Sequence, residues 1–334
     1  MTQPIRHDWT PEEILSLMTG PLDSLLEQAR QTHLRYAAQD VQQCKLLSVK
    51  TGACPENCGY CSQSAHFKTD LSTEPLLTVD KVLAAATQAK SEGATRFCLG
   101  AAWRQIPEGE RFDRILKMIG GVAELGMEVC CTLGMANQDQ LKRMKDAGLT
   151  AYNHNLDTSR EHYPKVVTTR TYDDRIQTLQ AARKAGVQLC CGGILGLGES
   201  LRDRAAMLAE LASFNPHPES VPINLLVPIE GTPLQNPSPV PFEEFLRMVA
   251  TARIVMPESR VRLSAGRASL TEEQQLACFR AGANSIFVGE KLLTTPNVSA
   301  ERDERLQEKW EEWEADTSLS PAEDSYLDSL HCTD

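Results

Sequence analysis

One local pattern of apolar and polar positions recurs along the chain: a helical stretch, a glycine, two residues and a short run of strand character. Its five copies, of which KDAG-LT-AYNHNLD is one, carry the glycine at Gly93, Gly126, Gly148, Gly186 and Gly282. A glycine just past a helix adopts the left-handed conformation that closes the last turn, and a two-residue link is typical of helix-to-strand loops. The pattern therefore predicts an α/β fold.

Three further apolar runs lack the glycine phrase and bring the number of expected strands to eight. The strands are expected near residues 46–52, 95–101, 128–134, 151–157, 188–196, 221–227, 261–266 and 285–289. Because helical stretches separate them, the strands should be parallel and joined by right-handed crossovers. Eight such units in about 245 residues favour a (β/α)₈ barrel of the TIM type. A doubly wound open sheet is the alternative, weakened because no GxGxxG motif follows the first strand.

The two ends of the chain differ from this repeating body. Thr10 and Glu13 have the spacing of a capping box, which predicts helices ahead of the barrel. Near residues 300–314 we expect an acidic helix with Trp310 and Trp313 on its apolar side, followed by a mobile end. The predicted N-terminal helical extension, barrel, and acidic C-terminal helix and tail occupy residues 1–40, 41–297 and 298–334.

The chain of 334 residues has a net charge of −11, but this charge is unevenly distributed. Residues 301–334 hold 12 Asp and Glu against 3 Lys and Arg, so the body is near neutral. An acidic chain argues mildly against nucleic acid as a partner. No apolar run approaches about 18 residues and the N-terminus lacks the apolar core of a signal peptide, so we expect no membrane span and a cytoplasmic location. In that reducing compartment, clustered cysteines more often bind metal than form disulfides.

Cys54, Cys58 and Cys61 directly follow the first expected strand, on the face where barrels carry their active sites. Three thiolates within eight residues can surround one soft metal centre. A closed zinc site would need a fourth ligand, and His66, the nearest candidate, has an unusual spacing. Three cysteines on a [4Fe–4S] cluster would leave one iron open to a substrate, which makes this cluster the favoured interpretation.

More cysteines fall inside expected strands, at Cys98, at Cys130 and Cys131, and at Cys190 and Cys191. Core packing is the alternative for them, since free cysteine is among the most buried residue types. Neighbouring strand residues point to opposite faces, so only one cysteine of each pair can face the barrel axis. Of the other cysteines, we expect two to be packed and one to lie on the tail, namely Cys44, Cys278 and Cys332.

The fourth expected strand carries Asn153, Asn155 and Asp157 on one face. Barrel interiors are normally filled with branched apolar side chains, so this polar row suggests bound polar ligands. A layer of mutually hydrogen-bonded side chains is the alternative.

The CxxxCxxC spacing, with Tyr60 before the last cysteine, resembles the radical S-adenosylmethionine (SAM) superfamily. Within it, the chain is similar to the branch that makes biotin, from about residue 8 to residue 297. The similar phrases are TGACPENC (51–58), YNHNLDT (152–158), TTRTY (168–172), INLLV (223–227), VRLSAGR (261–267) and GANSIF (282–287).

This resemblance implies a sulfurtransferase that cleaves SAM reductively at the [4Fe–4S] cluster to make 5′-deoxyadenosyl radicals. Sulfur from a [2Fe–2S] cluster would then be inserted into dethiobiotin, and no side-chain acid or base is required. The implied [2Fe–2S] ligands are Cys98, Cys130, Cys190 and Arg262. The implied SAM-binding residues are Tyr60, Asn155, Asp157, Arg175 and Ile194, and those for dethiobiotin are Asn153 and Asn224. Without the resemblance, Arg175 would be taken for a helix-surface arginine and Arg262 for a charge partner, because a protonated guanidinium has no lone pair.

The stretch after the second strand departs from the superfamily, with Gly100-Ala101-Ala102-Trp103 where Gly-Gly-Glu is common. Backbone carbonyls are therefore expected to hold the SAM amino group. The resemblance also implies an electron donor of the flavodoxin or ferredoxin type, Fe–S assembly machinery and a homodimer. Two alternatives stay open, a radical SAM enzyme with another small-molecule substrate and a non-catalytic Fe–S electron carrier.

Overall fold

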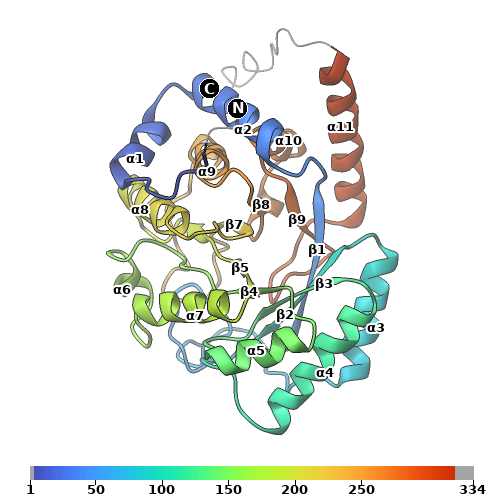
Figure 1. Cartoon of the computed structure of the whole chain (residues 1–334). Helices are drawn as coiled ribbons and strands as arrows, with labels where there is room; N and C mark the ends of the chain where they lie inside the picture. Colours follow the sequence, from blue (N-terminus) through green and yellow to red (C-terminus); the bar gives the residue numbers. More distant parts are fainter. Residues whose placement is uncertain (1–3, 320–334) are drawn as a thin grey trace.

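The computed structural model describes residues 4–319, and its centre is a closed parallel barrel (Figure 1). The strands neighbour one another in the order β5-β4-β3-β2-β1-β9-β8-β7-β6, and a pairing of β5 with β7 closes the circle. They are β1 (Gln42–Lys50), β2 (Arg96–Ala101), β3 (Glu128–Thr132), β4 (Ala151–Asn153), β5 (Gln188–Cys190), β6 (Gly193–Leu195), β7 (Ser220–Leu225), β8 (Arg260–Leu263) and β9 (Ser285–Val288). The predicted (β/α)₈ barrel is confirmed, and the open sheet is excluded.

Three strands differ most from their predicted bounds. β1 begins at Gln42 rather than near residue 46, because its two glutamines hide the strand pattern while Gln42 pairs with Ser285 of β9. The predicted fifth strand is divided into β5 and β6 at Gly192, where a Cβ would lie 1.9 Å from the Pro222 carbonyl oxygen. The fourth strand ends at Asn153, so the polar residues that follow belong to a loop.

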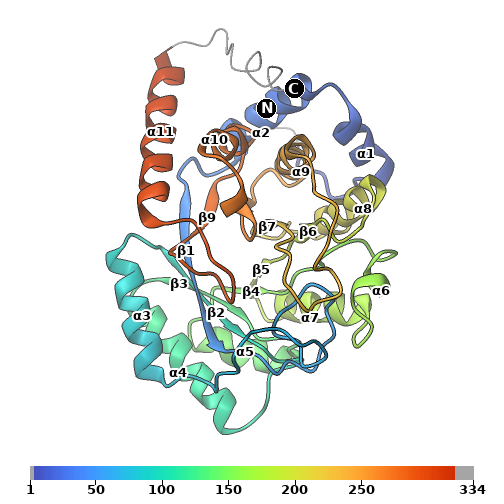
Figure 2. The ribbon, with the colours of Figure 1, turned by 180° about the vertical axis from the view of Figure 1, so that it is seen from behind.

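Helices surround the barrel on its outside (Figure 2). They are α3 (Val79–Ser91), α4 (Glu110–Glu124), α5 (Gln138–Asp146), α6 (Tyr163–Val166), α7 (Tyr172–Lys184), α8 (Leu201–Ala212), α9 (Phe242–Val255) and α10 (Glu272–Arg280), with a short 3₁₀ turn, η1 (Arg267–Ser269). The main hydrophobic core lies between strands and helices, and it includes both Cys131 and Cys191. Of the helices between residues 4 and 319, none combines the length and apolar character that a membrane span needs.

The N-terminal extension consists of α1 (Pro11–Thr19) and α2 (Leu22–Tyr36), which pack against α8 and α9 respectively (Figure 1). The predicted capping box is present, since the Glu13 backbone N–H donates to Thr10 and the Thr10 N–H donates to the Glu13 carboxylate.

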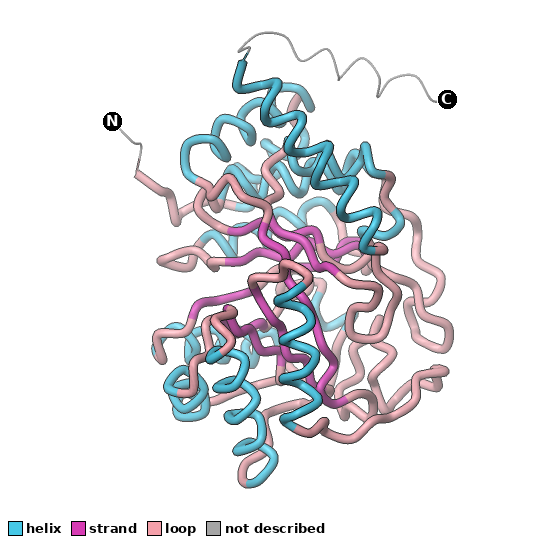
Figure 3. Tube along the Cα trace, turned by 90° about the vertical axis from the view of Figure 1, so that its right-hand side faces the viewer, coloured by secondary structure: helices cyan, strands magenta, loops and turns pink. Residues whose placement is uncertain are grey.

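The C-terminal helix α11 (Ala300–Leu319) is longer than predicted and lies against α10. In Figure 3 it is the helix that runs up to the grey trace ending at C. Trp310 meets the ring of Phe279 edge-on at a centroid distance of 5.5 Å and stacks on Trp313, which confirms the predicted apolar side. A buried ion pair of 2.6 Å between Arg267 and Asp303 fastens the start of the helix to the barrel. The predicted mobile end and Cys332 lie outside the described residues.

Candidate active site

A cavity of about 330 Å³ occupies the barrel interior and opens among the loops that follow the strands. It is lined by every residue that the sequence suggested as a ligand of metal, SAM or substrate. These are Cys54, Cys58, Tyr60, Cys61, Cys98, Cys130, Asn153, Asn155, Asp157, Arg175, Cys190, Ile194, Asn224 and Arg262. The structure thus brings together residues from a loop, a helix and seven strands or strand ends, while their individual roles stay predictions.

The loop after β1 holds its three cysteines by backbone hydrogen bonds. The Cys54 N–H donates to the Gln63 carbonyl at 2.8 Å, and the Cys61 N–H donates to the Cys58 carbonyl at 2.9 Å. Ala53 enters the loop with a φ of 51°, a left-handed conformation that a non-glycine residue seldom adopts. His66 has a ring nitrogen 3.0 Å from the Pro55 carbonyl oxygen and is not among the residues that line the cavity. It therefore lies apart from the cavity that the three cysteines line.

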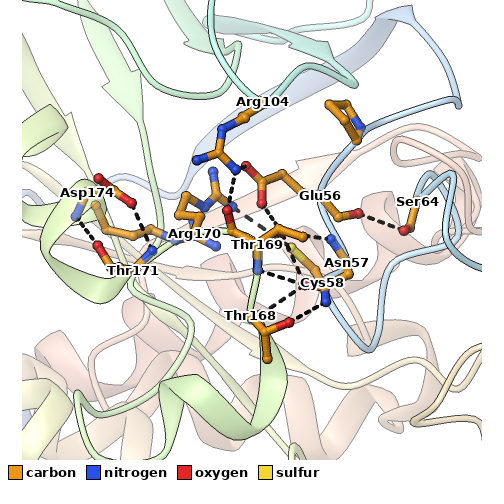
Figure 4. A network of polar contacts seen from close by, with 12 residues as sticks. Glu56, Asn57, Cys58, Ser64, Arg104, Thr168, Thr169, Arg170, Thr171 and Asp174 are labelled. Atoms are coloured by element: carbon orange, nitrogen blue, oxygen red, sulfur yellow. Dashed lines mark hydrogen bonds and ion pairs between the residues drawn. The ribbon is translucent and has the colours of Figure 1, made fainter.

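Polar contacts fasten this loop to the segment before α7 (Figure 4). Glu56 is buried, accepts a hydrogen bond from the Thr169 hydroxyl and forms an ion pair of 2.9 Å with Arg104. The Asn57 side-chain oxygen accepts the backbone N–H groups of Thr168 and Thr169 at 2.9 and 3.1 Å. These contacts explain the TTRTY phrase, which the sequence analysis could place only by resemblance.

Two buried arginines lie beside the loop cysteines. The Cys58 sulfur accepts a long hydrogen bond of 3.9 Å from Arg170, and the Arg170 Nε donates to the Tyr163 hydroxyl. Burial raises the pKa of the Cys58 thiol, which Arg175 and Arg170 partly offset. Burial, followed by the nearby Cys58 thiol, raises the pKa of Cys61 to about 12. The two guanidinium groups therefore lie where negative charge on sulfur needs compensation.

The Asp157 carboxylate contacts two other residues suggested for SAM binding, Tyr60 and Arg175. The Tyr60 hydroxyl donates to its Oδ2 at 2.9 Å, and Arg175 pairs with the same oxygen at 2.5 Å. Asp157 has a φ of 69°, and its backbone bonds to the β6 segment around Gly193. Strained conformations of this kind persist where surrounding contacts enforce them, often at functional sites. Arg175 is buried, so the alternative of a helix-surface arginine is wrong.

The polar row continues into the barrel through hydrogen-bonded amides. Asn153 donates to the Asn155 side-chain oxygen at 3.0 Å and accepts from the Thr132 hydroxyl at 2.9 Å. Asn224 donates to the Gly193 carbonyl at 2.9 Å and accepts the Ala265 N–H at 3.1 Å. These bonds agree in part with the alternative, a layer of side chains hydrogen-bonded to one another. Asn153 and Asn224 nevertheless also line the cavity.

Farther into the barrel, Cys98, Cys130 and Cys190 lie together in a buried cluster separate from the main core. Register explains this, because Cys98 of β2 is directly opposite Cys130 of β3. Arg262 is fully buried, and its Nη1 donates to the Cys190 sulfur at 3.5 Å. Since Cys131 and Cys191 belong to the main core, the expected facing of each cysteine pair is confirmed.

Below the cysteines, a polar plug closes the amino end of the barrel. Arg96 forms an ion pair of 2.7 Å with Glu128, and Gln42 donates to the same carboxylate oxygen at 2.8 Å. Sequence reasoning missed these contacts, because the first strand was expected to begin near residue 46 and no role was assigned to Arg96 or Glu128. Cys44 is buried, as expected, and it lies in the buried cluster with the three strand cysteines. The inward face of β1, read at a spacing of two from Leu46, would have indicated this position.

The donor sets suit iron–sulfur chemistry. Within residues 4–319, no three His, Cys, Asp or Glu side chains are grouped as one metal ion would require. Ten free cysteines are present among the described residues, and the two thiol sets that line the cavity are soft ligands with cationic neighbours. Such ligands are those that Fe–S clusters take in proteins.

Comparison with known proteins now connects this geometry to a family. Residues 48–211 match the Radical SAM superfamily, and residues 222–311 match the Biotin and Thiamin Synthesis associated domain. The biotin synthase of Beijerinckia indica is 56% identical over 310 residues, which cover 92% of this chain and 97% of that protein. The biotin synthase of Gloeobacter violaceus is also 56% identical, over 90% of this chain and 95% of that protein. The chain belongs to the biotin synthase family.

Members of the biotin synthase family are radical SAM enzymes, so this chain is an enzyme that uses SAM and a [4Fe–4S] cluster. The expected family, fold and function are confirmed, and the electron-carrier alternative is set aside. The second match runs to residue 311, so the family resemblance extends into α11, beyond the expected limit at residue 297.

Solved structures support the fold alone. The FeFe-hydrogenase maturase HydG from Carboxydothermus hydrogenoformans has a TM-score of 0.77 at 19% identity, over 90% of this chain and 75% of that chain. Methylornithine synthase (PylB) has a TM-score of 0.74 at 18% identity, over 92% of this chain and 96% of that chain.

Proposed function

We propose that this member of the biotin synthase family converts dethiobiotin to biotin, with two Fe–S clusters held in one cavity. The observation that carries the proposal is the succession of donor sets along the barrel. Cys54, Cys58 and Cys61 lie at the loop end, and a row of asparagines separates them from the buried cysteines of β2, β3 and β5. A substrate lying against the asparagines would have one cluster on either side.

The assignment of the clusters follows from the thiol sets. Cys54, Cys58 and Cys61 would hold the [4Fe–4S] cluster, whereas the [2Fe–2S] cluster would lie among Cys98, Cys130, Cys190 and Arg262. When bound, the first supplies the electron that cleaves SAM into methionine and a 5′-deoxyadenosyl radical, and the second supplies the sulfur atom.

The chain's own residues would bind and orient SAM. Asp157 offers carboxylate oxygens to the ribose hydroxyls, and Asn155 adds an amide. Arg175 would exchange part of its contact with Asp157 for the SAM carboxylate, a charge-assisted pairing of the same kind. Tyr60 and Ile194 would present apolar surface to the adenine ring.

Asn153 and Asn224 would position dethiobiotin through its ureido ring, since amides supply both donors and acceptors. The barrel wall and the buried Arg96, paired with Glu128 at the amino end, would limit the access of water to the cavity. Exclusion of water and fixed orientation are what a reactive radical requires, and no acid or base side chain is needed for hydrogen abstraction.

Further parts of the proposal concern partners. A flavodoxin- or ferredoxin-type protein would deliver electrons, and Fe–S assembly machinery would rebuild the sulfur-donating cluster. We also propose a cytoplasmic location, where free cysteines such as the ten among the described residues stay reduced. A homodimer is proposed from the family resemblance.

The deciding experiment is anaerobic reconstitution of the full chain with iron, sulfide, SAM, reductant and dethiobiotin, followed by mass spectrometry for biotin. With ³⁴S-labelled sulfide in the reconstitution, the label should appear in biotin. The Cys58→Ser variant provides the control without SAM cleavage. Formation of deoxyadenosine without any biotin would instead indicate a radical SAM enzyme with another substrate.

A further inference from the structure

Ser264 lines the cavity next to Asn224, one of the two residues proposed to hold dethiobiotin. It directly follows β8 and is only 2% exposed. Because strand side chains alternate, Ser264 lies on the same face of the barrel wall as Arg262, two residues earlier. Contacts with β7 fix its position, since the Ser264 N–H donates to the Ile223 carbonyl at 3.1 Å. The next N–H, that of Ala265, donates to the Asn224 side-chain oxygen at 3.1 Å.

The Ser264 hydroxyl is buried and has no hydrogen-bond partner among residues 4–319. Most buried polar side chains are hydrogen-bonded, because a buried hydroxyl without a partner destabilises the folded protein. The buried hydroxyl of Ser259, just before β8, does have a partner, since it donates to the Pro218 carbonyl at 2.7 Å. Ser220 also has an unpartnered hydroxyl, but Ser220 is not among the residues that line the cavity. The Ser264 hydroxyl is thus available to a polar group that binds in the cavity.

The two asparagines proposed to hold the ureido ring use most of their donor hydrogens within the protein. The Asn153 Nδ2 lies 3.0 Å from the Asn155 side-chain oxygen and 3.0 Å from the Cys190 carbonyl oxygen, so both of its hydrogens have acceptors. The Asn224 Nδ2 donates one hydrogen to the Gly193 carbonyl, which leaves one hydrogen free. Each of the two side-chain oxygens already accepts one hydrogen bond and can accept a second. The pair therefore offers a ligand two acceptor positions but only one donor.

A ureido ring presents two N–H donors and one carbonyl oxygen with two lone pairs. The free acceptor positions of Asn153 and Asn224 match the two N–H groups, but their single free donor leaves one lone pair of the carbonyl oxygen without a partner. We propose that the Ser264 hydroxyl supplies this second donor, which makes Ser264 a substrate-binding residue that selects for a carbonyl oxygen on the ring. The inference rests on the proposed function and adds a third side chain to the proposed dethiobiotin site.

The test compares the anaerobically reconstituted full chain with its S264A and S259A variants. S259A is the matched control, because Ser259 is equally buried but is not among the residues that line the cavity. With SAM present and reductant absent, titration calorimetry gives the Kd of dethiobiotin and of its thiocarbonyl analogue, in which sulfur, a weak acceptor, replaces the ureido oxygen. S264A should weaken the binding of dethiobiotin about fivefold, as for one lost hydrogen bond, and that of the analogue much less. S259A should leave the preference for oxygen over sulfur unchanged.

Thermal unfolding of the same samples separates substrate binding from folding. S259A loses a hydrogen bond and should unfold at a lower temperature, whereas S264A loses an unpartnered hydroxyl and should be at least as stable as the wild type. If S264A weakened dethiobiotin and its analogue equally, or weakened neither, the role of Ser264 would be overturned while the proposed function stood. A wild-type chain that binds SAM but neither dethiobiotin nor the analogue would overturn the proposed function as well.

Discussion

The loop end and the interior of the barrel hold similar thiols by different means. At the loop end, Cys54, Cys58 and Cys61 depend on hydrogen bonds between two loops, among them those of Glu56 and Asn57 with the segment before α7 (Figure 4). In the interior, the cysteines of β2, β3 and β5 are fixed by the register of the sheet.

The difference matches the two tasks proposed for the sites. A loop site can admit SAM and accept an electron, whereas a site on strands holds sulfur in one place beneath the substrate. Sites on strands are positioned more rigidly than sites on loops. The loop site should therefore respond to changes in supporting contacts, and the strand site mainly to changes of its own ligands.

The largest effect is expected from the loop cysteines. Changing Cys54, Cys58 or Cys61 to Ser removes one of three thiolates, so the [4Fe–4S] cluster should be lost and SAM cleavage abolished. Deoxyadenosine is measured by chromatography after incubation with SAM and dithionite. Continued formation of deoxyadenosine by any of the three variants would refute the assignment of this site.

Changes in the interior should separate the two sites. Cys98→Ala or Cys190→Ala should remove the visible absorption of the second cluster and abolish biotin formation, while SAM cleavage continues. Absorption spectra and deoxyadenosine assays on the same preparations measure both effects.

The neighbouring cysteines provide matched controls for this separation. Cys131 and Cys191 are as buried as the proposed ligands but belong to the core on the other face of the strands. Cys131→Ser and Cys191→Ser should keep both clusters and lose only some thermal stability, about 1–3 kcal/mol for a buried polar atom without a partner. If they lost the second cluster as completely as Cys98→Ala does, the facing argument would not explain the site.

The two regions also differ in what the sequence could predict. The spacing of Cys54, Cys58 and Cys61 indicated a metal centre without any structure, because its ligands are neighbours in the chain. The interior set has ligands about 30 to 160 residues apart, so only the expected barrel and the family resemblance could join them. Alternation predicted that only one cysteine of each pair faces the barrel axis, and the family resemblance implied which one.

The sequence did not reveal two features of the structure, namely certain long-range contacts and the start of β1. Glu56 and Arg170 act through partners more than 40 residues away, which no local pattern reveals. The start of β1 was missed because glutamines there broke the apolar pattern, although pairing with β9 extends the strand to Gln42. A prediction that rests on local periodicity misses residues whose structure is determined by tertiary contacts.

A moderate effect is expected between the two sites, at Asn153. Asn153→Ala removes an amide that lines the cavity and would contact the ureido ring, so the KM for dethiobiotin should rise about tenfold, as for one or two lost hydrogen bonds. Initial rates of biotin formation at several dethiobiotin concentrations give KM, while SAM cleavage is followed separately. Thr132→Val keeps the amide but removes the hydroxyl that orients it, and should have a smaller effect. An unchanged KM in Asn153→Ala would mean that Asn153 only supports the polar layer.

The smallest effect tests whether loop contacts support the first site. Glu56→Gln keeps the shape of the side chain but removes the charge that pairs with the partly exposed Arg104. An ion pair with a partly exposed partner contributes about 0.2–1 kcal/mol to stability. Iron should therefore be lost from the loop cluster to a chelator up to about fivefold faster. Asp146→Asn is the matched control, since it breaks an exposed ion pair with Lys142 on α5, away from the site. The rate of iron release, followed by absorbance, should change in Glu56→Gln alone. Equal rates of iron release in the two variants would show that the ion pair between Glu56 and Arg104 does not support the loop site.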